Sequence, residues 1–301
     1  MRADERAPAP TGVIHDIGYQ RYTGPRLGRR SVFAALYVHG LRTAFGLGRT
    51  AKAKIFPWMI VAIVGGAAIG SSMVHGLIGE PLFTYAGFAD VMSWLVFFFV
   101  AAVAPELVSR DLRAGVLPLY FSRPLPHTDY VLAKLAALAT AVWLLLGAPQ
   151  LFMFAVAVFT TDLAPRVVKE EVTDLLPGLA YAGVWAVLFA TVGLLVASLT
   201  GRRAFAAGGI VAVFLMTTPI VGVLSVMPSS TVNELAGLAA PLTLVQGVGV
   251  WLWRDALVRG PEAATSVEIG QFGPVYGLVA LVVIVACLGL LLARYRKVAA
   301  R

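Results

Sequence analysis

Six long apolar runs dominate the pattern of hydrophobic and polar positions along this chain. They lie near residues 56–78, 86–105, 135–160, 175–199, 204–227 and 272–293. Each run has about the roughly 20 residues that a helix needs to cross the hydrocarbon core of a bilayer. Asp90 lies near the start of the second run, away from its middle. The middle positions of all six runs are mostly Leu, Val, Ala, Phe and Gly. The pattern predicts an all-α integral membrane protein with six transmembrane helices.

A weaker periodic pattern precedes the first run. Phe33, Tyr37, Leu41 and Phe45 recur every four residues, and Arg42 lies on another face. Apolar residues at this spacing form one stripe of a helix. We therefore expect an N-terminal amphipathic helix that lies in the membrane interface. The alternative is an ordinary polar tail with a chance stripe.

The segment between the fifth and sixth runs, residues 228–271, is too apolar for a solvated loop. Pro241 and several glycines interrupt it, so it does not read as a regular span. We expect one or two short re-entrant helices here, with Trp251 and Trp253 at the headgroup level. The alternative is a seventh span.

Composition supports the membrane assignment. The chain has 301 residues, of which 59% are hydrophobic, and 30 glycines lie outside that count. Soluble domains contain about 45–50% apolar residues even when glycine is included. Cys287 is the only cysteine in the sequence, which excludes an intramolecular disulfide and a cysteine-based zinc site.

Basic residues predict the orientation. If the N-terminus is cytoplasmic, only four of the 24 Lys and Arg residues lie outside: Arg166, Lys169, Arg254 and Arg259. This follows the positive-inside rule. We expect a multi-pass protein of the cell (plasma or inner) membrane with both termini cytoplasmic, and no nucleic-acid partner despite the formal charge of +8. Residues 1–55 would form the cytoplasmic N-terminal segment, 56–296 the transmembrane domain and 297–301 a cytoplasmic tail.

The predicted cytoplasmic segment 106–134, between the second and third spans, combines charge with apolar residues. A helix is expected to continue from the second span to Gly115, and a new one to begin at Thr128 or Asp129. The intervening prolines exclude a continuous helix. An apolar turn bordered by charge is typical of a docking site. A plain cytoplasmic loop would explain its basic residues, but not its acidic and apolar ones.

The residue pattern of this segment resembles the segment that follows the second span in ABC-2 type transporter permeases. The resemblance is carried by a Glu at the end of the span, a Gly followed by apolar residues, a Ser-Arg-Pro turn and a Lys that starts the next span. In this chain these are Glu106, Gly115, Val116, Leu117, Ser122, Arg123, Pro124 and Lys134. The order of an amphipathic helix, six spans and a long outer segment before the last span is also similar.

The resemblance implies an ABC-2 type permease fold and an exporter subunit without enzymatic activity of its own. A separate ATP-binding cassette ATPase, which carries ATP and magnesium, would dock on the 106–134 segment, and a second permease copy would complete the pathway. This chain would hold no cofactor, metal or catalytic residue. The expected coupling residues are Glu106, Arg110, Asp111, Arg113, Gly115, Leu117, Leu119, Tyr120, Ser122, Arg123, Pro124, Asp129 and Lys134.

Motifs for chemistry are absent from the sequence. It contains no G-x-x-x-x-G-K-[ST] phosphate loop, no H-E-x-x-H and no G-x-S-x-G. The predicted spans carry few ionisable residues at mid-membrane depth, which disfavours an ion-coupled secondary carrier. That carrier, and a non-transporting membrane scaffold or sensor, remain the two alternatives to the exporter subunit.

Overall fold

The structure is a computed structural model, and it describes residues 24, 28–48, 51–79, 81–115, 125–160, 165–258 and 267–299. Within these residues all regular secondary structure is helical, and no strand occurs. The helices are α1 (Arg29–Ala44), α2 (Ala51–Ile78), α3 (Tyr85–Leu107), α4 (Ser109–Arg113), α6 (His127–Thr160), α7 (Pro165–Ser198), α8 (Arg203–Leu215), α9 (Thr218–Leu224), α10 (Ser230–Leu235), η1 (Ala236–Ala239), α11 (Pro241–Val258) and α12 (Gly273–Ala299).

Six helical stretches in the described residues are long and apolar enough to cross a membrane. They are Ala53–Ile78, Tyr85–Arg113, His127–Thr160, Val168–Ser198, Arg203–Leu224 and Gly273–Val298. Each overlaps one of the six apolar runs in the sequence. The prediction of an all-helical chain with six apolar, membrane-length helices is therefore confirmed, and this architecture indicates a multi-pass membrane protein.

Helices α6 and α7 begin well before the apolar runs from which they were predicted. The runs start near residues 135 and 175, whereas the helices start at His127 and Pro165. The start of α6 lies within two residues of the start predicted at Thr128 or Asp129, so only the extension of α7 was missed, because its charged residues lie outside the apolar run. A helix continues into a polar region where its backbone hydrogen bonds and side-chain partners favour it, so the apolar run marks the hydrocarbon depth rather than the end of the helix.

The fifth predicted span is broken into α8 and α9 at Met216 and Thr217. Pro219 lacks a backbone N–H, which removes one hydrogen bond of the regular ladder. The hydroxyls of Thr217 and Thr218 donate to the Val213 and Phe214 carbonyls at 2.8 and 3.1 Å. Such bonds to preceding carbonyls compensate for freed backbone groups within membrane helices.

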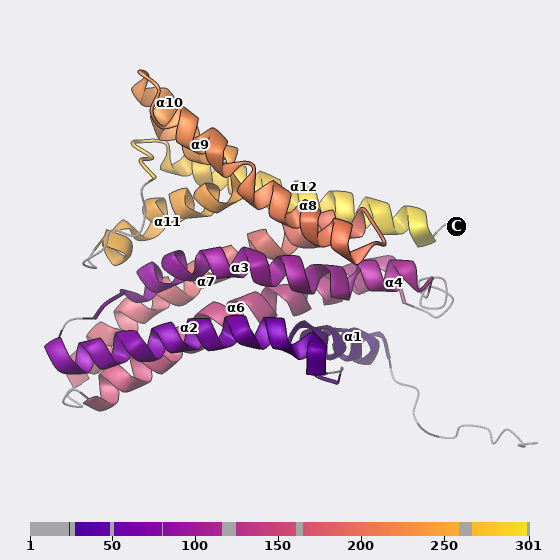
Figure 1. The fold of residues 1–301 in the computed structure, drawn as a ribbon, viewed down its shortest axis with the longest axis horizontal. Coiled ribbons are helices and arrows are strands. Elements are labelled where there is room, and N and C mark those ends of the chain that lie inside the picture. The colour runs from indigo at the N-terminus through magenta and orange to yellow at the C-terminus, as the bar shows by residue number, and fades with distance from the viewer. Residues whose placement is uncertain are drawn as a thin grey trace, which may run out of the picture.

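Helix α3 lies at the centre of the bundle and packs against α6, α7 and α8 (Figure 1). The ring of Phe214 on α8 stacks on Phe97 of α3 and on Phe189 of α7, with centroid distances of 6.2 and 4.3 Å. In contrast to α3 and α7, the pair α8–α9 and helix α12 expose most of their apolar side chains. These outer helices therefore offer apolar faces to lipid or to another protein.

The segment between α9 and α12 contains short helices, as the sequence suggested. Ser230–Ala239 and Pro241–Leu257 meet at an angle of 117°. Tyr276 on α12 holds this segment through a 2.8 Å hydrogen bond from its hydroxyl to the Glu234 carbonyl. The segment is thus a bent helix pair, which counts as a seventh crossing only if the two halves together form one broken span.

Helix α1 packs against the bundle rather than facing lipid alone. Leu36, Gly40 and Ala44 are buried, and a Cβ on Gly40 would lie 2.8 Å from the Cβ of Ala137 on α6. The predicted stripe of Phe33, Tyr37, Leu41 and Phe45 is partly buried against the same core. The periodicity therefore located a real helix, but much of its apolar surface meets protein.

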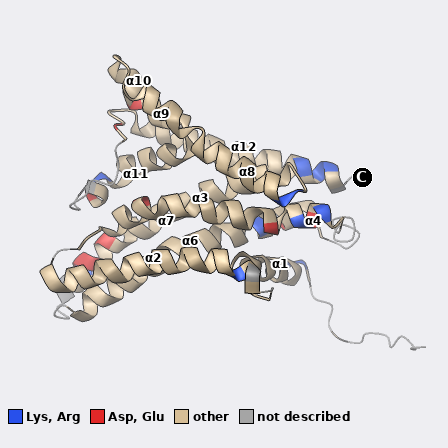
Figure 2. Ribbon diagram, in the orientation of Figure 1, with Lys and Arg blue, Asp and Glu red and all other residues tan. Residues whose placement is uncertain are grey.

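Charged residues divide between the two ends of the bundle (Figure 2). Lys and Arg gather where α1, α4, the first turns of α6 and α8 and the last turns of α12 lie together. We call this the basic end. The acidic residues of the first turns of α7 lie at the opposite end. This separation is the structural counterpart of the charge pattern in the sequence.

Candidate functional site

The candidate site lies at the basic end, where α3 continues as α4. Val108 has φ −125° and ψ −53°, so the helix axis is interrupted there before α4 begins at Ser109. The Ser109 hydroxyl donates to the Ala197 carbonyl near the end of α7 at 2.7 Å. Gly115 follows α4 with a φ of +61°, a left-handed conformation that glycine adopts at little cost. The short α4 is thus fixed to α7 at its start and ended by a glycine.

Three acidic residues of the predicted coupling segment form ion pairs within the chain. Glu106 Oε1 lies 2.5 Å from Arg203 Nη1 on α8. Asp111 Oδ2 lies 2.9 Å from Lys134 Nζ on α6.

The third pair joins α1 to α6. Asp129 accepts two hydrogen bonds from the Arg29 guanidinium, of which the Nη2–Oδ1 bond is 2.6 Å. The hydrogen bond to Asp129 raises the pKa of Arg29 above its ordinary value, so the guanidinium stays charged. Thr128 or Asp129 was expected to cap this helix, but both lie inside the first turn of α6, which begins at His127.

Aromatic residues connect these ion pairs to the last helix. The Tyr130 hydroxyl donates to Asp111 Oδ2 at 2.7 Å, and the Lys134 ammonium lies 5.4 Å from the centroid of the Tyr130 ring. The Tyr130 ring contacts Tyr295 on α12 with a centroid distance of 5.2 Å. The hydrogen bond and the ion pair to Asp111 thus join α4 to α6, and the ring contact joins α6 to α12.

Two expected coupling residues point outward from this network. Arg110 and Arg113 are exposed, whereas Glu106, Asp129 and Lys134 are buried. The buried charges serve the packing of helices within this chain, and the exposed guanidinium groups are the ones that an external partner could reach. Val116, Leu117, Leu119, Tyr120, Ser122, Arg123 and Pro124 lie outside the described residues.

A second polar cluster lies nearer the end opposite the basic end, and it was not predicted from the sequence. Asp90 on α3 is 2% exposed, and it accepts a 2.7 Å hydrogen bond from the Tyr181 hydroxyl on α7. Gln246 on α11 donates to the other carboxylate oxygen at 3.4 Å. The sequence signal that could have revealed this cluster is the lone carboxylate of Asp90, because an acidic side chain in an apolar helix requires hydrogen-bond donors from neighbouring helices.

In the part of the chain that the structure describes, no group of three or more His, Cys, Asp and Glu side chains could hold a metal ion. The paired charges and the ring contact at the basic end involve six helices, α1, α3, α4, α6, α8 and α12. Comparison of the chain with protein-family models and with curated protein sequences gives no match.

Proposed function

We propose that this chain is the permease subunit of an ATP-binding cassette exporter of the ABC-2 type. In this proposal the basic end is cytoplasmic, and a separate ATPase subunit, which holds ATP and magnesium, docks on the 106–134 segment. The chain carries out no hydrolysis itself. Movement of the ATPase would shift α4, and α4 would shift the membrane helices to which it is joined.

One observation carries the proposal. The exposed Arg110 and Arg113 lie on a short helix whose other side is fixed to α6 by the Asp111–Lys134 ion pair. A loop that only connects two spans needs no such attachment, whereas a loop that transmits force does. The similarity of the segment to the ABC-2 pattern in sequence supports the same function.

The exposed apolar faces fit the second permease copy that the proposal requires. Phe205 on α8 is 67% exposed and Leu278 on α12 is 61% exposed in the single chain. Lipid would cover such side chains equally well. Crosslinking between copies is therefore part of the test rather than a premise of it.

Co-purification tests the proposal directly. The tagged chain, extracted in mild detergent from its native host, should carry a P-loop ATPase with it. ATPase activity of the reconstituted complex should rise when cargo is added, and an ATPase variant without its phosphate-loop lysine should remove this activity. Isolation of the chain without any ATPase, combined with transport that continues after ATP depletion, would refute the proposal.

The buried Asp90 cluster favours one second candidate, an ion-coupled secondary carrier. Intramembrane carboxylates often form part of proton or ion pathways, and this one has Tyr181 as a hydrogen-bonded neighbour. In this case a protonophore, rather than ATP depletion, would stop transport in vesicles. Charge removal at Arg110 would then leave transport intact.

A further inference from the structure

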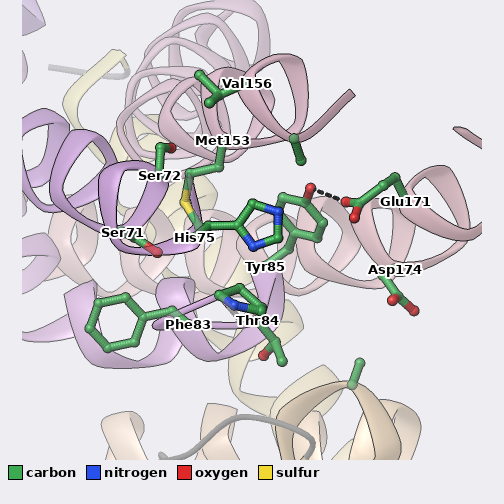
Figure 3. A pocket seen from close by; sticks show the side chains of 13 residues that line it. Ser71, Ser72, His75, Phe83, Thr84, Tyr85, Met153, Val156, Glu171 and Asp174 are labelled. Atoms are coloured by element: carbon green, nitrogen blue, oxygen red, sulfur yellow. Dashed lines mark hydrogen bonds between the residues drawn. The ribbon is translucent and has the colours of Figure 1, made fainter. Parts of the chain in front are cut away.

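A cavity of about 120 Å³ lies at the end of the bundle opposite the basic end. It is formed by the last turns of α2 and α6, the first turns of α3 and α7, and one residue of α11 (Figure 3). Neither the ion pairs and rings at the basic end nor the Asp90 cluster contributes a residue to this cavity. The cavity therefore needs an explanation of its own.

The lining of this cavity is acidic on one side. Glu171 and Asp174 both border it, and no Lys or Arg is among the described residues that line it. Glu171 is half-buried, whereas Asp174 is exposed at the rim. On the adjoining surface, Lys169 lies beside Asp174 and Arg166 is held by Glu170 at 2.9 Å. The described lining thus brings two carboxylates to one side of the cavity.

Polar atoms without protein partners face the same space. Ser71 lines the cavity at 1% exposure, and its hydroxyl has no hydrogen-bond partner among the residues that the structure describes. The buried Nδ1 of His75 also lacks a hydrogen-bond partner within the described part of the chain. Buried polar groups normally have hydrogen bonds, and an unsatisfied one costs about 1–3 kcal/mol. These two atoms therefore indicate an occupant, solvent or ligand, that supplies the missing hydrogen bonds.

The Glu171 carboxylate is held in place by Tyr85. The Tyr85 hydroxyl donates to Glu171 Oε2 at 2.5 Å, as Figure 3 shows. A carboxylate accepts several hydrogen bonds, so this bond orients the group and leaves capacity for a further donor. The remaining wall is apolar, with Met153, Val156 and Phe83. A fixed carboxylate acceptor beside an apolar wall fits an ammonium group that is attached to a short hydrocarbon chain.

The geometry points to a binding site for a small organic ammonium group in this cavity. The ammonium would bind at Glu171, Asp174 would attract it to the mouth, and Ser71 lies across the cavity from Glu171 (Figure 3). Its stem would lie against Met153 and Val156. A volume of 120 Å³ is about that of four waters, which suits a ligand of about five non-hydrogen atoms. The site goes beyond the exporter proposal and does not depend on an ATPase.

Two sources could supply this group, a soluble alkylamine and the ethanolamine headgroup of a lipid. The first test uses n-butylammonium as the probe and the full chain in phosphatidylcholine nanodiscs, with binding measured by saturation-transfer NMR. For so small a ligand we expect a dissociation constant on the order of 1 mM. Neutral n-butanol should bind at least about tenfold more weakly, since it lacks the charge-assisted hydrogen bond.

Variants separate this site from nonspecific binding. Glu171→Gln should weaken n-butylammonium binding by about tenfold or more, and Asp174→Asn provides a second, exposed change that leaves the packing intact. Glu170→Gln is the matched control, because Glu170 neighbours Glu171 in sequence but does not line the cavity. It should bind n-butylammonium as the unaltered chain does. Equal binding of n-butanol and n-butylammonium, or equal binding by all variants, would overturn the proposal.

A second experiment identifies the source. Nanodiscs that contain phosphatidylethanolamine should weaken n-butylammonium binding if the headgroup occupies the cavity, and this competition should disappear in Glu171→Gln. Unchanged n-butylammonium binding in those nanodiscs would assign the site to soluble amines. Either result supports an ammonium site, whereas absence of n-butylammonium binding in both lipid compositions refutes it. Co-purification of an ATPase is measured separately, so the exporter proposal stands or falls independently.

Discussion

Asp111 on α4 and Lys134 on α6 form an ion pair of 2.9 Å, with side chains that are 18% and 6% exposed. The Tyr130 hydroxyl donates to the same carboxylate oxygen. The pair therefore lies in a partly desolvated site, where each charge depends on the other. It joins the short helix at the end of the second span to the start of the third.

Replacement of Lys134 by methionine tests the structural weight of this pair. Lys134→Met should lower the free energy of unfolding by about 2–4 kcal/mol, because it leaves the Asp111 carboxylate without its cation. Denaturation of the purified chain in mild detergent measures the change. Arg110→Met, at an exposed position nearby, should change stability by less than about 0.5 kcal/mol. An equal loss of unfolding free energy in both variants would show that the Asp111–Lys134 pair does not stabilise the fold.

The exposed arginines give a prediction about partner binding. If α4 docks on an ATPase, the double change Arg110→Glu and Arg113→Glu should reduce co-purification of that subunit at least about tenfold, because like charges at an interface cost several kcal/mol. Thermal stability of the chain should stay unchanged. Lys169→Glu, at the opposite end, is the control and should leave the complex intact. Retention of the ATPase by the double variant would place the interface elsewhere.

Length and hydropathy were sufficient to predict the helical architecture. An apolar run of bilayer length has one regular way to satisfy its backbone, so six runs predicted six helices. The start of α6 near Thr128 or Asp129 was predicted from capping residues, whereas the extension of α7 was not, because its charges looked unfavourable in a span until their partners were known. Arg29 and Asp129 are 100 positions apart in the sequence, and only the tertiary fold brings them together.

The candidate site, like the fold, could be predicted from the sequence only in part. The sequence picked out Glu106, Asp111 and Asp129 as unusual charges, but it assigned them to an external partner. The structure pairs each of them with a basic residue of the chain itself. Spacing identifies a charged residue that needs a partner, whereas the direction in which its side chain points depends on how the helices pack. The Asp90 cluster was missed for the same reason.

The Asp90 cluster should contribute to stability through Tyr181. Tyr181→Phe removes the closer donor to a buried carboxylate and should lower the free energy of unfolding by about 1.5–3 kcal/mol. Denaturation in mild detergent again provides the measurement. Tyr37→Phe is the matched control, because its hydroxyl makes only a 3.2 Å bond to Thr140 in a partly exposed position. A smaller effect at Tyr181 than at Tyr37 would contradict the assigned role of the cluster.

Close packing of α3 against α7 depends on Gly193. A Cβ at this position would overlap the Cγ1 of Val100 on α3. Gly193→Ala should therefore destabilise the chain by about 1–3 kcal/mol, as measured by the denaturation midpoint. The added change Val100→Ala should restore part of the loss. Gly208→Ala, on α8 where nothing lies within 4 Å, should be neutral or slightly stabilising. Destabilisation by Gly208→Ala but not by Gly193→Ala would contradict this prediction.

Orientation in the membrane can be measured with single cysteines. In a Cys287→Ser background, Arg110→Cys places a thiol at the basic end and Glu170→Cys places one at the opposite end, both at exposed positions. The positive-inside rule predicts that a membrane-impermeant maleimide, added to right-side-out vesicles, labels only Glu170→Cys. Arg110→Cys should react only after the vesicles are opened. Labelling of Arg110→Cys in sealed vesicles would place the basic end outside the cell, where no cytosolic ATPase could reach α4.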